Sequence, residues 1–112
     1  MSGDLTIHAV QQQAWANKLA KGFNTVDAAL EFGLAYGELA EAFDAWRKGE
    51  SSLGEELADV LLYLVALAQM NGVDLEGETR RKLAINAARE YRTGSNGTLR
   101  KVGADVQEAP GV

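Results

Sequence analysis

Hydrophobic residues run through positions 5–92 with polar residues between them, and stop signals divide this stretch into four predicted helices. Glycines at positions 22, 49 and 72 end the first three helices, because glycine readily adopts the left-handed conformation of a helix terminus. The single proline is Pro110, so proline bars nothing before it from being helical. The expected helices are Leu5–Lys21, Val26–Lys48, a third from Ser52 to about Gly72, and Leu75–Arg92.

Polar residues mark the expected helix starts. Thr25 is a good N-cap for the second helix, and Asp74 is one for the fourth. Ser52 and Glu55 have the spacing of a capping box, in which each side chain bonds to the other's backbone amide. The connections are short, so neighbouring helices should be antiparallel.

The third helix is apolar around most of its circumference. Its hydrophobic residues are Leu57, Val60, Leu61, Leu62, Leu64, Val65, Leu67 and Ala68. A helix of this kind must be buried on nearly all sides, which four helices of one small chain cannot achieve. The sequence therefore predicts an all-α, four-helix bundle completed by dimerisation, with the third helix at the interface.

Composition and charge narrow the function classes. The 112 residues are 46% apolar and 24% charged, which suits one globular domain, expected over residues 1–92 with a flexible tail over 93–112. A net charge of −5 argues against nucleic-acid binding, which needs a basic surface. The absence of cysteine and the single histidine, His8, exclude disulfides, zinc–thiolate sites and multi-histidine metal sites. No apolar stretch suits a membrane span and the N-terminus lacks signal-peptide features, so a cytoplasmic location is expected.

Two pairs of carboxylates carry the candidate chemistry. Glu38 and Glu41 lie three residues apart on the second helix, and Glu56 and Asp59 do so on the third. Residues at this spacing share a helix face, and an antiparallel hairpin would bring the pairs opposite one another. Four such carboxylates repel one another unless a cation neutralises them. Oxygen ligands alone favour Mg²⁺, Mn²⁺ or Ca²⁺, whereas a solvated acidic surface is the plain alternative.

These segments resemble the MazG-type nucleoside triphosphate pyrophosphohydrolases of the all-α NTP pyrophosphatase superfamily. The resemblance spans about residues 23–92 and is carried by the segments 37–42 and 55–61. It implies a helical dimer or tetramer whose carboxylates hold Mg²⁺, with Mn²⁺ as a substitute, on a nucleotide's phosphates. Glu38, Glu41, Glu56 and Asp59 would be the metal-binding and catalytic residues. The family usually has a further metal-binding glutamate where this chain has Ala35, and Glu31 is too far along the helix to replace it on the same ion.

Other residues have weaker indications. Lys82, Asn86 and Arg89 form one stripe of the fourth helix and resemble the family's phosphate-binding segment, although a solvated basic face would look the same. Tyr63 and Trp46 are candidate nucleotide contacts by the same resemblance, and either would also suit a hydrophobic core or interface. Glu55 competes for a role in activating water, but its capping-box position accounts for it structurally.

The function expected from this resemblance is hydrolysis of a (d)NTP to a monophosphate and pyrophosphate, which would clear unwanted nucleotides. The expected partners are the nucleotide substrate and further copies of the chain. Ala35 keeps open the alternative of a non-catalytic nucleotide- or metal-binding module. A purely structural dimerisation domain is the third hypothesis.

Overall fold

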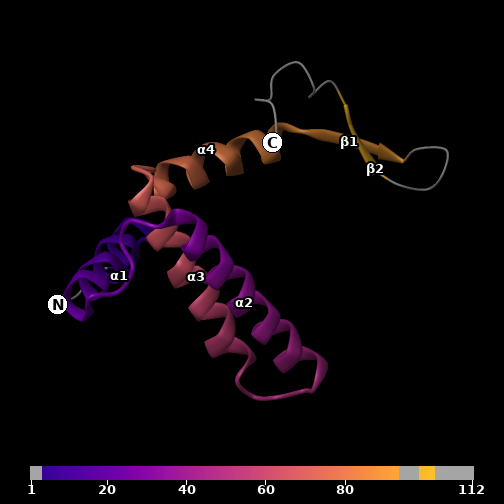
Figure 1. Ribbon diagram of the computed structural model, residues 1–112. Coiled ribbons are helices and arrows are strands. Elements are labelled where there is room, and N and C mark those ends of the chain that lie inside the picture. Colours follow the sequence, from indigo (N-terminus) through magenta and orange to yellow (C-terminus); the bar gives the residue numbers. More distant parts are fainter. Residues whose placement is uncertain (1–3, 94–98, 103–112) are drawn as a thin grey trace. The chain divides into compact units, whose positions relative to one another are not determined.

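The computed structural model describes residues 4–93 and 99–102 and has four helices followed by two short strands. The helices are α1 (Ile7–Lys21), α2 (Ala28–Arg47), α3 (Leu53–Met70) and α4 (Leu75–Ala88). The strands are β1 (Glu90–Thr93) and β2 (Leu99–Val102), which pair antiparallel. The four predicted helices are therefore confirmed, whereas the strand pair was not foreseen (Figure 1).

The described residues divide into two compact units, one ending at Glu78 and the other beginning at Thr79. The predicted single domain over residues 1–92 and flexible tail over 93–112 stay predictions. Residues 94–98 and 103–112 of that tail lie outside the described residues.

In the first unit, α2 and α3 form a helical hairpin and α1 packs against α3 (Figure 1). The buried apolar residues are mostly small: Ala35, Ala42 and Ala45 on α2, with Val65, Ala66, Leu67 and Ala68 on α3. Small side chains let the two helices of the hairpin approach closely. Gln11, which is buried on α1, donates from Nε2 to Oε1 of Gln69 and to the carbonyl of Val73, each at 3.0 Å. These contacts fix α1 beside the C-terminal half of α3.

The helix termini confirm some of the predicted caps and helix ends and contradict others. Gly22, Gly49 and Gly72 all have positive φ, as expected of glycines that end helices. Asp74 caps α4 through a 3.1 Å bond from the Gly77 amide to its Oδ1. The N-cap of α2 is Asp27 rather than Thr25, since Oδ1 of Asp27 accepts from the Leu30 amide at 3.0 Å.

The predicted capping box at Ser52 is wrong. Ser52 is the N-cap residue of α3, but its side chain makes no capping hydrogen bond. Its backbone φ of −82° and ψ of 0° depart from the extended conformation in which a serine Oγ reaches the next turn. The structural explanation offered for Glu55 therefore falls away, and Glu55 is an exposed residue in the first turn of α3.

Candidate metal centre

The inward face of α2 is defined by a repeating step of four and three residues. Glu31, Ala35, Glu38, Ala42 and Ala45 follow this spacing, and all are buried except Glu38, which is half-buried. The alanines leave room beside α3, and Glu38 projects into that space. One helical face thus combines close packing with a carboxylate directed at the neighbouring helix.

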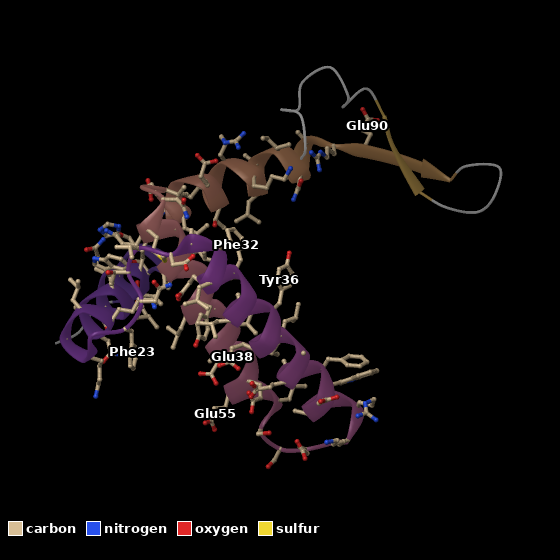
Figure 2. All side chains as sticks on the ribbon, viewed as in Figure 1. Phe23, Phe32, Tyr36, Glu38, Glu55 and Glu90 are labelled. Atoms are coloured by element: carbon tan, nitrogen blue, oxygen red, sulfur yellow. The ribbon has the colours of Figure 1, made fainter. Side chains whose placement is uncertain are left out.

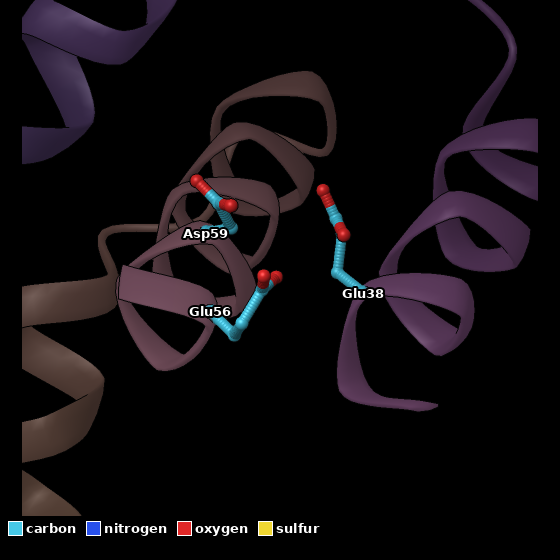
Figure 3. Close-up of side chains that lie close together, drawn as sticks. All are labelled: Glu38, Glu56 and Asp59. Atoms are coloured by element: carbon cyan, nitrogen blue, oxygen red, sulfur yellow. The ribbon is translucent and has the colours of Figure 1, made fainter. Parts of the chain in front are cut away.

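Glu56 and Asp59 approach Glu38 from the facing surface of α3. One carboxylate oxygen from each of these three residues lies within 4.8 Å of the other two (Figure 3). Oxygens that bind one Mg²⁺ at about 2.1 Å lie up to about 4.2 Å apart, so small side-chain movements would enclose a cation. The three residues are hereafter the carboxylate triad. Their oxygen-only donor set fits Mg²⁺ or Mn²⁺.

Burial and mutual repulsion raise the pKa of two members of the triad, Glu38 and Glu56. Partial burial raises the pKa of Glu38 above its ordinary value, and the Glu41 charge, a hydrogen bond with Glu41 and the charges of Asp59 and Glu56 raise it further. Partial burial also raises the pKa of Glu56, with added repulsion from Glu41 and Asp59. A divalent cation would relieve this repulsion, which is the electrostatic reason to expect one here.

Glu41, the fourth predicted ligand, lies outside the triad. It is exposed and interacts with the Glu38 carboxyl rather than joining the group of three. Ala35 is buried with 9% of its surface exposed, so the position of the missing glutamate is packed by a methyl group. The structure therefore brings together three of the four predicted carboxylates.

A cavity of about 550 Å³ opens beside the triad, between α1, α2 and α3. Glu38 and Asp59 line it together with Tyr63, one turn beyond Asp59. Burial and the nearby charges of Glu38, Glu31, Asp59 and Glu41 raise the pKa of Tyr63, so its hydroxyl keeps its proton at neutral pH and can donate a hydrogen bond.

The α1 side of the cavity holds residues that the sequence analysis did not single out. Gln13, Asn17 and Lys18 line it from α1, and Glu31 lines it from α2. The inward stripe of α1 runs Ile7, Gln11, Ala14, Lys18, and two of its members are polar and buried. Polar residues at otherwise apolar positions of an amphipathic stripe are the signal that could have identified this wall.

The remaining predicted contacts are Trp46 in the first unit and three residues of α4 in the second. Trp46 is 64% exposed, and its ring lies 5.9 Å from that of Phe43, centroid to centroid. It is not among the described residues that line the cavity. In the second unit, Nη1 of Arg89 donates to Oδ1 of Asn86 at 2.9 Å, and Lys82 precedes them on α4. The phosphate-binding role of these three residues stays a prediction.

Residues 34–84 match the family described as the MazG nucleotide pyrophosphohydrolase domain. The matched segment contains the whole carboxylate triad. This segment, slightly less than half of the chain, is therefore similar to a MazG domain. The resemblance seen in the sequence is therefore confirmed for this segment.

Two relatives from Cyanophage S-2L extend the comparison. A curated "dATP/dGTP diphosphohydrolase" is 43% identical over 56 residues, which are 49% of this chain and 53% of the relative. This alignment thus spans about half the length of that protein. A solved structure, described as a MazG-like pyrophosphohydrolase bound to dGDP and three catalytic Mn²⁺ ions per active site, is 26% identical with a TM-score of 0.64. It matches over 88% of this chain and 99% of its own, so the helical fold is that of a MazG-like protein.

Proposed function

We propose that this MazG-like protein is a divalent-metal-dependent nucleotide pyrophosphohydrolase. The observation that carries the proposal is the carboxylate triad, whose ligand oxygens converge within 4.8 Å inside the segment matched by the MazG family. The reaction would split a (d)NTP between its α- and β-phosphates to give a monophosphate and pyrophosphate. Both relatives bear names of enzymes that hydrolyse nucleotide anhydrides.

In this proposal the acidic residues have two different roles, metal binding and proton transfer. Glu38, Glu56 and Asp59 would hold Mg²⁺ or Mn²⁺. The ion would neutralise phosphate charge and lower the pKa of a bound water. Glu41, which is exposed beside Glu38, is proposed to accept a proton from the attacking water. Lys82, Asn86 and Arg89 are proposed to stabilise charge on the departing pyrophosphate.

The cavity suits the nucleoside part of the substrate. Phe23 and Leu62 supply apolar surface, while Gln13 and Asn17 supply amides that can both donate and accept hydrogen bonds. Such walls can stack on a base and bond to its polar edge. We therefore propose purine deoxynucleotides as the first substrates to test, in line with the names of the relatives.

We also propose that the chain acts as a homodimer, or as a pair of dimers. Phe32, Tyr36, Leu39, Phe43 and Trp46 follow the four-and-three spacing along α2, and each is at least 50% exposed. On α3, Leu57, Leu61 and Leu64 repeat the spacing and are between 44% and 50% exposed. Tyr36 and Glu38 point in opposite directions from α2, so this apolar surface is separate from the triad (Figure 2). A second copy would bury both stripes.

The test is a panel of the four dNTPs and four NTPs incubated with Mn²⁺ or Mg²⁺, with monophosphate and pyrophosphate measured separately. Release of pyrophosphate from dATP or dGTP, abolished by EDTA, is the expected result. Release of inorganic phosphate alone would place the cleavage at a different bond and contradict the proposal.

Ala35 specifically favours a second candidate, a nucleotide-binding module without turnover. It removes one carboxylate from the position where the family has a metal ligand, and the site could then hold too few ions for catalysis. Mn²⁺-dependent binding of a non-hydrolysable dGTP analogue, together with no product from any nucleotide, would support this candidate. A role in clearing unwanted nucleotides applies only to the catalytic proposal.

A further inference from the structure

A buried ion pair forms one wall of the cavity and has no part in the function proposed above. Nζ of Lys18, on α1, lies 2.9 Å from Oε2 of Glu31, on α2. The Glu31 side chain is fully buried, and only 11% of the Lys18 side chain is exposed. Both residues line the cavity together with Glu38 and Asp59 of the triad.

Glu31 is held from its other side by the loop before α2. Nδ2 of Asn24 donates to Oε1 of Glu31 at 3.1 Å and to the Asp27 carbonyl at 2.8 Å. Oδ1 of Asn24 accepts from the Asp27 amide at 3.0 Å, which fixes the asparagine in the turn. The carboxylate of Glu31 therefore has a defined position, and it fixes the ammonium of Lys18 in turn.

Stability alone does not account for this pair. Withdrawing two charges from water costs roughly as much as their attraction returns, and well-packed apolar residues often replace such pairs without loss. A buried pair at a cavity wall therefore indicates a use for one of its charges.

The charges that line the cavity indicate that the Lys18 ammonium is the group with a further role. Among the described residues that line it, three are carboxylates and Lys18 is the one cation. An ammonium carries three N–H donors, and the described contact of Lys18 with Glu31 is an ion pair. A nucleotide brings several phosphate oxygens, which a lysine binds as a compact point charge.

We propose that Lys18 is a substrate-binding residue whose ammonium contacts a phosphate oxygen of the nucleotide, and that Glu31 is its positioning residue. This inference rests on the function proposed above. It assigns to α1 a part in phosphate recognition, in addition to closing the cavity.

The decisive variant is the double substitution Lys18→Met with Glu31→Gln. It removes both charges together and keeps side-chain size, so no buried charge is left unpaired. Lys21→Met is the matched control, because Lys21 is an exposed lysine of the same helix and does not line the cavity. Melting temperature, KM for dGTP with Mn²⁺, and affinity for a non-hydrolysable dGTP analogue are measured for each protein.

The double variant should melt within a few degrees of the wild type, because no buried charge is stranded. Its KM should rise, and its analogue affinity fall, by about tenfold or more, as expected for the loss of a charged hydrogen bond. The control should match the wild type in all three measurements. Unchanged KM and unchanged analogue affinity in the double variant would overturn the inference.

Two further comparisons cover the cases in which the double variant does not fold or the wild type has no activity. If the double variant does not fold, Lys18→Arg decides, since it keeps the charge but replaces the compact ammonium with a broader guanidinium. A KM several-fold above that of the wild type is then expected, and an unchanged KM and analogue affinity would overturn the inference. If the wild type itself releases no product, the catalytic proposal fails, while analogue affinity still tests Lys18.

Discussion

Glu56 and Glu55 are adjacent on α3 but have different surroundings. Glu56 belongs to the carboxylate triad, whereas Glu55 is exposed and outside it. Glu56→Gln should therefore lower kcat by a factor on the order of 10² or more, because a metal ligand is lost. Glu55→Gln should leave kcat near that of the wild type and change the free energy of unfolding by less than about 0.5 kcal/mol.

Steady-state kinetics with dGTP and Mn²⁺, together with chemical denaturation, measure both effects. Glutamine preserves side-chain size and helix propensity in each variant, so the pair differs only in which charge is removed. An inactive Glu55→Gln beside an active Glu56→Gln would show that the wrong side of α3 has been assigned to the metal.

The raised pKa values of Glu38 and Glu56 predict how stability depends on pH without metal. A carboxyl whose pKa is higher in the folded state binds more protons there than when unfolded. Its stabilising contribution is therefore full below the unfolded pKa, and stability falls as pH rises through the folded pKa. In EDTA, the melting temperature should accordingly rise as the pH is lowered from 7 to just above the ordinary glutamate pKa.

With millimolar Mn²⁺ the melting temperature should instead be higher at pH 7 than at the lower pH. The cation neutralises the triad at pH 7, whereas protons compete with it as the pH falls. Thermal melts across this range, with and without Mn²⁺, provide the test. Glu38→Gln is the matched variant and should weaken both effects. Equal melting temperatures with EDTA and Mn²⁺ at pH 7 would count against a metal centre here.

At the residue scale, the sequence predicted the triad because its two carboxylate pairs have helical spacing and a short hairpin between them. It did not predict that Glu41 would lie outside the triad, since this depends on how the α2 helix is rotated towards α3. The alanines of the inward stripe fix that rotation. Lys18 was missed for a related reason: nothing local shows that a lysine of α1 meets a glutamate thirteen positions away.

At the scale of the elements, helix identity was easier to predict than helix termini. All four helices were expected, but α4 ends at Ala88 and the residues that follow form β1 instead of continuing the helix to Arg92. The strand pair depends on contacts between Glu90–Thr93 and Leu99–Val102, which helical spacing cannot reveal. The start of α2 was placed two residues early because Thr25 and Asp27 are both acceptable caps in sequence.

The corrected cap of α2 can be tested with two matched variants. Asp27→Ala removes the side-chain oxygen that accepts from the Leu30 amide, so it should lower the free energy of unfolding by about 0.5–2 kcal/mol. Thr25→Ala removes a hydroxyl that does not cap the helix and should change it by less than about 0.5 kcal/mol. Urea denaturation of the two variants measures the difference, and equal losses would mean that Thr25 also caps α2.

At the scale of the molecule, the exposed apolar stripes of α2 and α3 are the main feature that one chain leaves unexplained. No single helix among the described residues is long and apolar enough to cross a membrane, although α3 and α4 meet that test when taken as a bent pair. The stripes repeat at the four-and-three spacing of helices that pack against helices. The sequence predicted an uncovered α3 from its composition, and the aromatic stripe of α2 now extends the same surface.

Leu61→Lys should convert the proposed dimer into a monomer. Leu61 is 44% exposed in the middle of the α3 stripe, so a second copy would bury it, and a buried unpaired ammonium opposes association. Light scattering should give the wild type at least twice the 12.0 kDa chain mass and the variant a single chain mass. Leu19→Lys is the control, because Leu19 is a 59% exposed leucine of α1 outside both stripes. A wild-type monomer at micromolar concentration would contradict the proposed interface. Loss of assembly in both variants would also contradict it, because it would indicate a general effect of added charge.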